Sequence, residues 1–250
     1  MKKSKKAILM LLALLAVLLL VSIGFVAWAG DAADPMPEAI ATLTTDAQVT
    51  VNQDEWITFT PTGAQPDSGL IIYPGGRVDP RAYAPIAHAI ASQGYQVVIV
   101  PMPLNLAFFD ANAASDVITA YPEIRQWAIA GHSLGGAMAA QYAYNHPDQV
   151  DGLVLWAAYP AQNANLSGYD LDVVSVYGTE DGLASIADIE NAKNLLPTDV
   201  QWWPITGGNH AQFGWYGDQS GDNPATIDRA TQQAQIIEAT LNLLNNLKPQ

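Results

Sequence analysis

Short apolar segments alternate with segments of helical periodicity along most of this chain, and this alternation limits its fold more than any other feature. Apolar runs that predict buried strands occur at 69–73, 96–100, 127–130, 153–157, 173–177 and 200–205. Helices are predicted between or after them at 85–93, 117–121, 134–145, 185–196 and 227–247. Such alternation is typical of an α/β fold, with a mostly parallel sheet and helices on both faces.

The residues before the first buried strand have a different pattern. Residues 47–51 and 56–60 alternate apolar and polar side chains around Asn52-Gln53-Asp54-Glu55, which predicts an antiparallel hairpin. Residues 31–46 are rich in Ala, Asp, Pro and Thr and predict a linker. The chain therefore divides into an N-terminal segment at 1–30, a linker at 31–46 and an α/β domain at 47–250.

The composition excludes several classes of protein. Half of the 250 residues are hydrophobic and 14% are charged, which excludes a disordered chain. The absence of Cys excludes a disulfide scaffold, thiolate metal sites and a cysteine nucleophile. From residue 31 onward there are six basic and 24 acidic residues, a net formal charge of −18. Because this charge repels phosphate backbones, no nucleic-acid partner is expected.

The N-terminal segment predicts a membrane-associated helix. Lysines occupy positions 2, 3, 5 and 6, and residues 7–30 are uncharged and mostly aliphatic. Those 24 residues exceed the roughly 20 that span a bilayer core. The positive-inside rule then predicts a single-pass anchor in the cell membrane with the domain outside the cytoplasm. The alternative is a signal peptide cleaved near Ala29, which would give a secreted protein.

The clearest chemical motif is Gly131-His132-Ser133-Leu134-Gly135, which matches G-x-S-x-G between a predicted strand and a predicted helix. In that context the chain turns sharply, with Ser133 exposed at the start of the helix. The helix N-terminus favours negative charge that develops there. The motif therefore predicts a nucleophilic serine, and the alternative is a glycine-rich turn with a serine helix cap.

A nucleophilic serine needs a base and an acid that orients the base. His210 follows the strand at 200–205, at the carboxyl edge of the predicted sheet, whereas His88 and His146 lie within or at the end of helices. His132, beside Ser133, is expected to point away from it. Asp181 follows the strand at 173–177 and is the predicted acid, with its neighbour Glu180 as the alternative.

Two backbone N–H groups are needed to stabilise the oxyanion of an acyl-transfer reaction. The N–H of Leu134, directly after the nucleophile, is one candidate. Gly76, in the turn after the strand at 69–73, supplies the other, with Arg77 as its alternative. The competing interpretation of this segment is an ordinary Pro-Gly-Gly turn.

Further residues near these motifs are candidates for binding a substrate. Arg77 is a candidate partner for a substrate carboxylate, although Arg77 or Arg81 pairing with Asp79 is the simpler interpretation. Trp215 is a candidate for an apolar pocket around His210, together with Trp202, Trp203, Phe213 and Tyr216. For Trp202 and Trp203, alternation across a strand accounts equally well for the pattern.

The serine turn, the Asp181 and His210 loops and Tyr73-Pro74-Gly75-Gly76 together resemble the α/β-hydrolase superfamily over residues 47–247. The similarity is greatest to its lidless, dienelactone-hydrolase-like and "alpha/beta hydrolase fold-5" branch. It implies hydrolysis of small-molecule esters, lactones or thioesters through an acyl-enzyme, without metal or organic cofactor. One departure is Pro74, where many members carry His before the oxyanion glycine.

The resemblance also bears on the surroundings of the site and on rival functions. Residues 159–171 are too few for the helical lid that many relatives insert, so an open site is expected. The alternatives are a peptidase or acyltransferase using the same three residues, a haloperoxidase-like or lyase activity, and a non-catalytic binding protein, because the fold alone does not choose between them.

Overall fold

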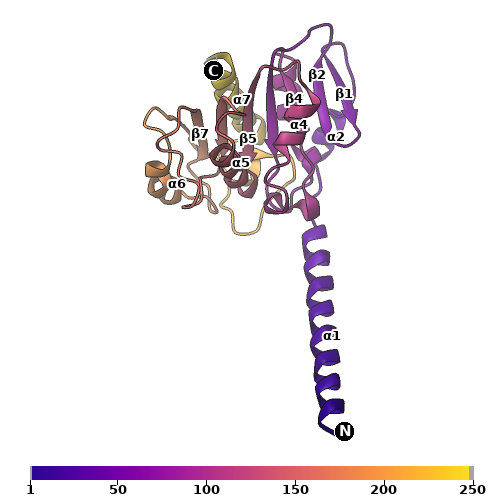
Figure 1. Cartoon of the computed structure of the whole chain (residues 1–250). Helices are drawn as coiled ribbons and strands as arrows, with labels where there is room; N and C mark the ends of the chain where they lie inside the picture. Colours follow the sequence, from indigo (N-terminus) through magenta and orange to yellow (C-terminus); the bar gives the residue numbers. More distant parts are fainter. Residues whose placement is uncertain (1, 248–250) are drawn as a thin grey trace.

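The structure is a computed structural model that describes residues 2–247, and a single sheet of eight strands forms its centre (Figure 1). The strand order is β1-β2-β4-β3-β5-β6-β7-β8. β1 and β2 pair antiparallel with each other, β2 pairs antiparallel with β4, and all later pairs are parallel. The strands are β1 (Val49–Gln53), β2 (Ile57–Pro61), β3 (Ser68–Tyr73), β4 (Gln96–Ile99), β5 (Gln126–His132), β6 (Gly152–Trp156), β7 (Asp172–Gly178) and β8 (Gln201–Ile205).

Helices cover both faces of this sheet. α3 (Ala84–Ala91) and α7 (Arg229–Asn245) pack on one face, and α4 (Ala114–Ala120) and α5 (Leu134–Asn145) pack on the other. Alternate residues of the buried strands enter the two cores, as period-two geometry requires: Leu70 lies in the first core and Ile71 in the second. The predicted mostly parallel α/β fold with an N-terminal antiparallel hairpin is confirmed.

The predicted and observed element boundaries differ where tertiary contacts decide them. The helix at 134–145 has the predicted bounds, but β5 continues to His132 because it pairs with β6 up to Trp156. The predicted helix at 185–196 is shorter: α6 (Ile186–Ala192) gives way to the 3-10 turn η4 (Lys193–Leu195) before Pro197, a residue that disfavours helix before it. Residues 157–171 contain neither helix nor strand, so no lid is present there.

Two N-terminal helices precede the sheet. α1 (Lys2–Gly30) projects away from the domain, and its segment Lys5–Gly30 is long and apolar enough for a membrane span or a signal sequence (Figure 1). The predicted linker contains α2 (Pro37–Ala41), whose Ala39 is fully buried. Met36 N donates a hydrogen bond to Trp215 O (2.8 Å), so this segment packs on the domain.

The start of α5 lies unusually close to the ends of β3 and β5. A Cβ atom on Gly131 would lie 2.4 Å from the carbonyl carbon and oxygen of Gly135. A Cβ atom on Gly135 would lie 2.2 Å from Tyr73 O. Because backbone atoms, rather than flexible side chains, occupy these positions, glycine is required at both residues for the strand-to-helix turn to close.

We expect Gly131→Ala to lower the free energy of unfolding by at least about 3 kcal/mol, because β5 and α5 must separate to admit the methyl group. The measurement is urea unfolding of the full chain in detergent, followed by tryptophan fluorescence. Gly168→Ala is the matched control, since nothing lies within 4 Å of its added Cβ, and it should change stability by no more than about 0.5 kcal/mol. Similar stabilities for the two variants would contradict the steric argument.

Candidate active site

Ser133 occupies the turn between β5 and α5 in a strained backbone conformation. Its φ of 52° and ψ of −121° lie where non-glycine residues are rare. Its N–H donates to Trp156 O (3.0 Å) and its carbonyl accepts from Ala137 N (3.0 Å), so both neighbouring elements hold the turn. The predicted position of Ser133 at the first residue before a helix is therefore observed.

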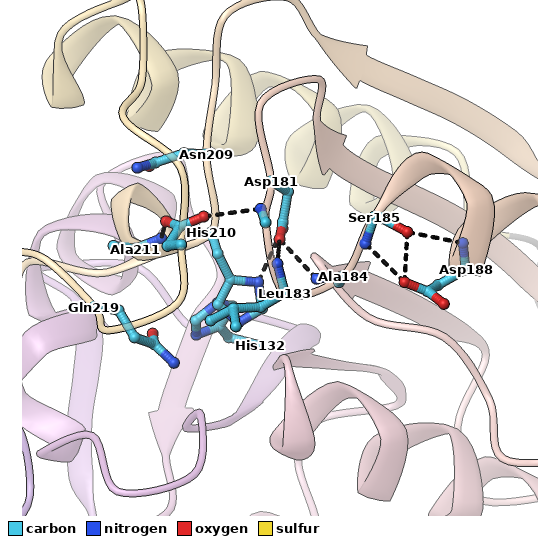
Figure 2. A network of polar contacts seen from close by, with 12 residues as sticks. His132, Asp181, Leu183, Ala184, Ser185, Asp188, Asn209, His210, Ala211 and Gln219 are labelled. Carbon is cyan, nitrogen blue, oxygen red and sulfur yellow. Dashed lines mark hydrogen bonds and ion pairs between the residues drawn. The ribbon is translucent and has the colours of Figure 1, made fainter.

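His210 and Asp181 form a buried hydrogen-bonded pair on the two loops that follow β7 and β8. His210 Nδ1 lies 2.8 Å from Asp181 Oδ2, and the side chains are 1% and 0% exposed (Figure 2). Asp181 Oδ1 accepts from the backbone N–H groups of Leu183 (2.8 Å) and Ala184 (2.7 Å). These bonds fix the carboxylate so that its second oxygen meets the imidazole. Asp181, and not the half-exposed Glu180, is the residue brought to His210.

The same hydrogen bond determines the role of the other nitrogen of a neutral His210 ring. An Nδ1–H that donates to Asp181 leaves Nε2 as an acceptor. His210 Nε2 is buried and has no hydrogen-bond partner within residues 2–247. Buried nitrogens are normally paired, so an unpaired one calls for an explanation such as a catalytic role.

Ser133 and His210 border one cavity of 210 Å³ at the carboxyl edge of the sheet. Its remaining walls are mostly apolar and come from the start of α5 and from the segments after β6 and β7: Leu134, Ala137, Ala157, Ala158, Tyr159, Leu183 and Ala184. Tyr159 and Leu183 were not singled out in the sequence. Both residues follow predicted strands closely, and this position could have identified them, because ligands bind at the carboxyl ends of parallel strands.

Some backbone N–H groups beside Ser133 already donate a hydrogen bond within the protein, and others do not. The N–H of Gly75 donates to the Tyr83 hydroxyl (2.9 Å) and that of Arg77 to Asn105 O (2.8 Å). In the described part of the chain, Gly76 N–H and Leu134 N–H have no such partner. A Cβ on Gly76 would lie 3.1 Å from the Leu134 side chain, so the two backbones are close. Gly76 and Leu134 are therefore the available donors, and Arg77 is not.

His132, to which the sequence analysis assigned no function, lies against His210. Their ring centroids are 4.6 Å apart (Figure 2). The Phe213 ring also stacks on His132, with centroids 5.6 Å apart. His132 Nδ1 and the hydroxyl of Tyr83 share a hydrogen bond (2.8 Å), and the same hydroxyl accepts from Gly75 N–H. Burial, and secondarily the charge of His210, hold the pKa of His132 well below its usual range. His132 is therefore a neutral ring.

The two side chains predicted to bind substrate, those of Arg77 and Trp215, contact other parts of the protein. The Arg77 guanidinium bonds to Asp31 O (2.6 Å) and Oδ2 (3.2 Å), and Arg81 pairs with both carboxylate oxygens of Asp79. Trp215 packs near the Arg229 guanidinium, 6.0 Å from its ring, and borders neither Ser133 nor the 210 Å³ cavity.

The aromatic residues around His210 in the sequence divide into two groups in space: Phe213 and Tyr216 pack against His132, and the two tryptophans of β8 do not. Trp202 and Trp203 pack into opposite cores, as alternation along β8 requires. Phe213 is buried, with its ring stacked on that of His132. Together with the position of Trp215, these placements give the proposed aromatic pocket no support.

Solved structures of similar fold are enzymes by their descriptions. A protein described as a predicted CIB-like hydrolase from Thermoplasma acidophilum superimposes with a TM-score of 0.56 at 15% identity, covering 80% of this chain and 98% of that one. Esterase 2 of Thermogutta terrifontis, phosphonylated by sarin, gives a TM-score of 0.57 at 15% identity, with coverage of 82% and 97%. At such identities the likeness concerns the fold.

The sequence comparisons identify the family. No curated protein sequence matches the chain. The profile of the alpha/beta hydrolase family matches residues 69–234, which contain Ser133, Asp181 and His210 and make up about two thirds of the sequence. Because that match covers more than half of the chain, this protein belongs to the alpha/beta hydrolase family.

Proposed function

We propose that this protein is a serine hydrolase that cleaves carboxylic esters, lactones or thioesters through an acyl-enzyme. The observation that carries the proposal is the His210–Asp181 pair: His210 borders the same cavity as Ser133, and its Nε2 has no hydrogen-bond partner within residues 2–247. A serine and a histidine on one cavity, with a carboxylate on the far nitrogen of the histidine, support the roles of nucleophile, base and acid in acyl transfer.

In this mechanism Ser133 Oγ attacks the acyl carbonyl while His210 Nε2 takes the hydroxyl proton. Asp181 holds Nδ1–H and stabilises the imidazolium. The N–H groups of Leu134 and Gly76 donate to the oxyanion of the tetrahedral intermediate. His210 then protonates the leaving alcohol or thiol, and a water molecule activated by the same nitrogen hydrolyses the acyl-enzyme.

The neutral His132 supports this mechanism by its position. A cation at His132 would repel the imidazolium that forms on His210, 4.6 Å away between ring centroids. Burial keeps that cation from forming by lowering the pKa of His132. Through Tyr83, His132 also holds the N–H of Gly75, adjacent to the proposed oxyanion donor Gly76.

We further infer that α1 stays attached and anchors the protein in the cell membrane, with the hydrolase domain outside the cytoplasm. Its lysine-flanked, apolar sequence supports this topology. A signal peptide cleaved near Ala29 is the alternative, and identifying the N-terminus of the mature protein by mass spectrometry distinguishes the two.

A fluorophosphonate probe should label Ser133 of the full-length protein. Ser133→Ala should abolish the labelling and lower kcat for p-nitrophenyl esters by roughly 10³-fold or more, because the acyl-enzyme route is lost. The exposed Ser167 supplies the control, since Ser167→Ala should leave labelling and turnover unchanged. Labelling that persists in Ser133→Ala would assign the nucleophile to another residue.

The two neighbouring acids should differ sharply. Asp181→Asn removes the charge that orients His210 and should lower kcat by about 10²- to 10⁴-fold with little change in KM, because Asp181 acts on the transition state. Glu180→Gln is the matched control and should retain most of the activity. Steady-state kinetics on one soluble ester measures both, and the reverse ranking would move the acid to Glu180.

Stability should depend on pH through His132. The unfolded chain takes up a proton at this residue near pH 6.5, whereas the folded chain does so only at lower pH because the pKa is lowered. Stability is therefore present above about pH 6.5 and is lost as the pH falls, by on the order of 1 kcal/mol per pH unit for one proton. Urea unfolding at pH 5 to 7.5 should show a shallower slope for His132→Gln than for the native protein. Parallel curves would mean that folding does not lower the pKa of His132.

A further inference from the structure

The last turns of α1 pack against the segment that borders the active site. Asn105 Nδ2 donates to Ala29 O (3.2 Å), and the Phe25 ring lies edge-on to Phe109 with centroids 6.1 Å apart. Figure 1 shows α1 leaving the domain beside this segment, which follows β4. The Arg77 side chain completes the junction, with its guanidinium 4.6 Å from the Trp28 ring centroid. The apolar helix and the loop that carries Gly76 therefore meet directly.

Exposed apolar side chains follow two separate strands at this edge of the sheet. Leu104, Phe108 and Phe109, after β4, are 37%, 48% and 47% exposed, and Leu183 and Ile186, after β7, are 38% and 42% exposed. We call these five residues the apolar rim. They follow the carboxyl ends of parallel strands, as Ser133 does, and Leu183 also lines the cavity. Large exposed apolar surfaces mark places where a protein contacts a partner or a membrane.

The contact between α1 and the residues after β4 also determines how deep the apolar rim would lie in a membrane that α1 spans. Phe25 lies five residues before the end of α1, about 7.5 Å along the helix axis at 1.5 Å per residue. Since Phe109 contacts Phe25, it reaches the level of the apolar part of α1. With α1 across a bilayer, Phe108 and Phe109 lie where aromatic side chains collect, at the boundary between headgroups and acyl chains.

We propose that α1 holds this edge of the domain against the bilayer, that the apolar rim seats in the lipid surface, and that the substrates are acyl esters resident in that membrane. The substrate assignment rests on the ester hydrolysis proposed above. The 210 Å³ cavity is smaller than the roughly 300–1,000 Å³ of pockets that enclose a whole ligand. It therefore takes the reacting part of a substrate whose remainder stays in the lipid.

The negative charge of the domain disfavours one class of membrane esters, those with anionic headgroups. From residue 31 onward the net formal charge is −18, which repels anionic lipids. The esters that reach Ser133 are therefore those with uncharged or zwitterionic headgroups.

A labelling experiment tests the seating without any use of activity. The chain contains no Cys, so Phe108→Cys and Ile40→Cys each accept a single NBD fluorophore in the full-length protein. Ile40 is the matched control: it is 42% exposed, and Figure 1 shows its helix α2 set back from the point where α1 leaves the domain. In phosphatidylcholine proteoliposomes that contain a headgroup nitroxide lipid, the label at 108 should be quenched and the label at 40 should not. No quenching at 108, or equal quenching at both positions, overturns the proposal.

A kinetic experiment tests the substrate class. The double variant Phe108→Ser/Phe109→Ser should lower kcat/KM for 4-methylumbelliferyl oleate in the same vesicles by roughly tenfold or more, since apolar burial in the lipid is lost. Its turnover of soluble p-nitrophenyl acetate should stay within about twofold of the native value, because neither residue touches the reacting atoms. Ile40→Ser is the control and should affect neither substrate.

The outcomes of the two experiments separate the membrane proposal from the proposed function. Equal losses on both esters, or unchanged turnover of the vesicle ester, overturn the membrane-resident substrate and leave ester hydrolysis intact. A native protein inactive on both esters, but quenched at 108, supports the membrane seating and overturns the proposed hydrolysis.

Discussion

The close approach of the α5 N-terminus to β3 and β5 is the constraint on which the site depends. Gly131 and Gly135 let three backbone segments meet with no room for a methyl group between them. This contact forces Ser133 into a positive-φ conformation at the head of α5. It also brings Leu134 beside Gly76, so the serine and both free N–H donors are positioned by one packing arrangement. The strained backbone of Ser133 persists because β5 and α5 fix the chain on either side of it.

Much of this arrangement follows from local sequence. The alternation of apolar runs and helices predicts the parallel sheet, and a parallel sheet places every strand-end loop at one edge. Ser133, Asp181 and His210 are therefore predicted to lie close together although they are far apart in sequence. The strand-to-helix turn is equally predictable from the motif, although only the clash at Gly131 is local: a Cβ atom on Gly135 would meet the distant Tyr73 backbone.

What the sequence does not predict depends on contacts between distant segments. His132 contacts Tyr83 and Phe213, which lie 49 and 81 positions away, and nothing near residue 132 indicates either partner. Arg77 follows a glycine turn and was a candidate for binding substrate, but its actual partner is Asp31 from another part of the chain. Trp215 was expected near the substrate for its position in the sequence, and the fold turns it toward Arg229.

Arg77 adds to the contacts between the end of α1 and the domain. Its N–H donates to Asn105 O within the domain, and its side chain holds Asp31 and covers Trp28 at the end of α1. Proteolysis after Ala29 would leave Asp31 on the domain but would remove Trp28 with the helix. The guanidinium beside Gly76 would then lose its aromatic support. If α1 anchors the protein as proposed, cleavage that releases the domain would therefore also change the contacts of the loop that carries Gly76.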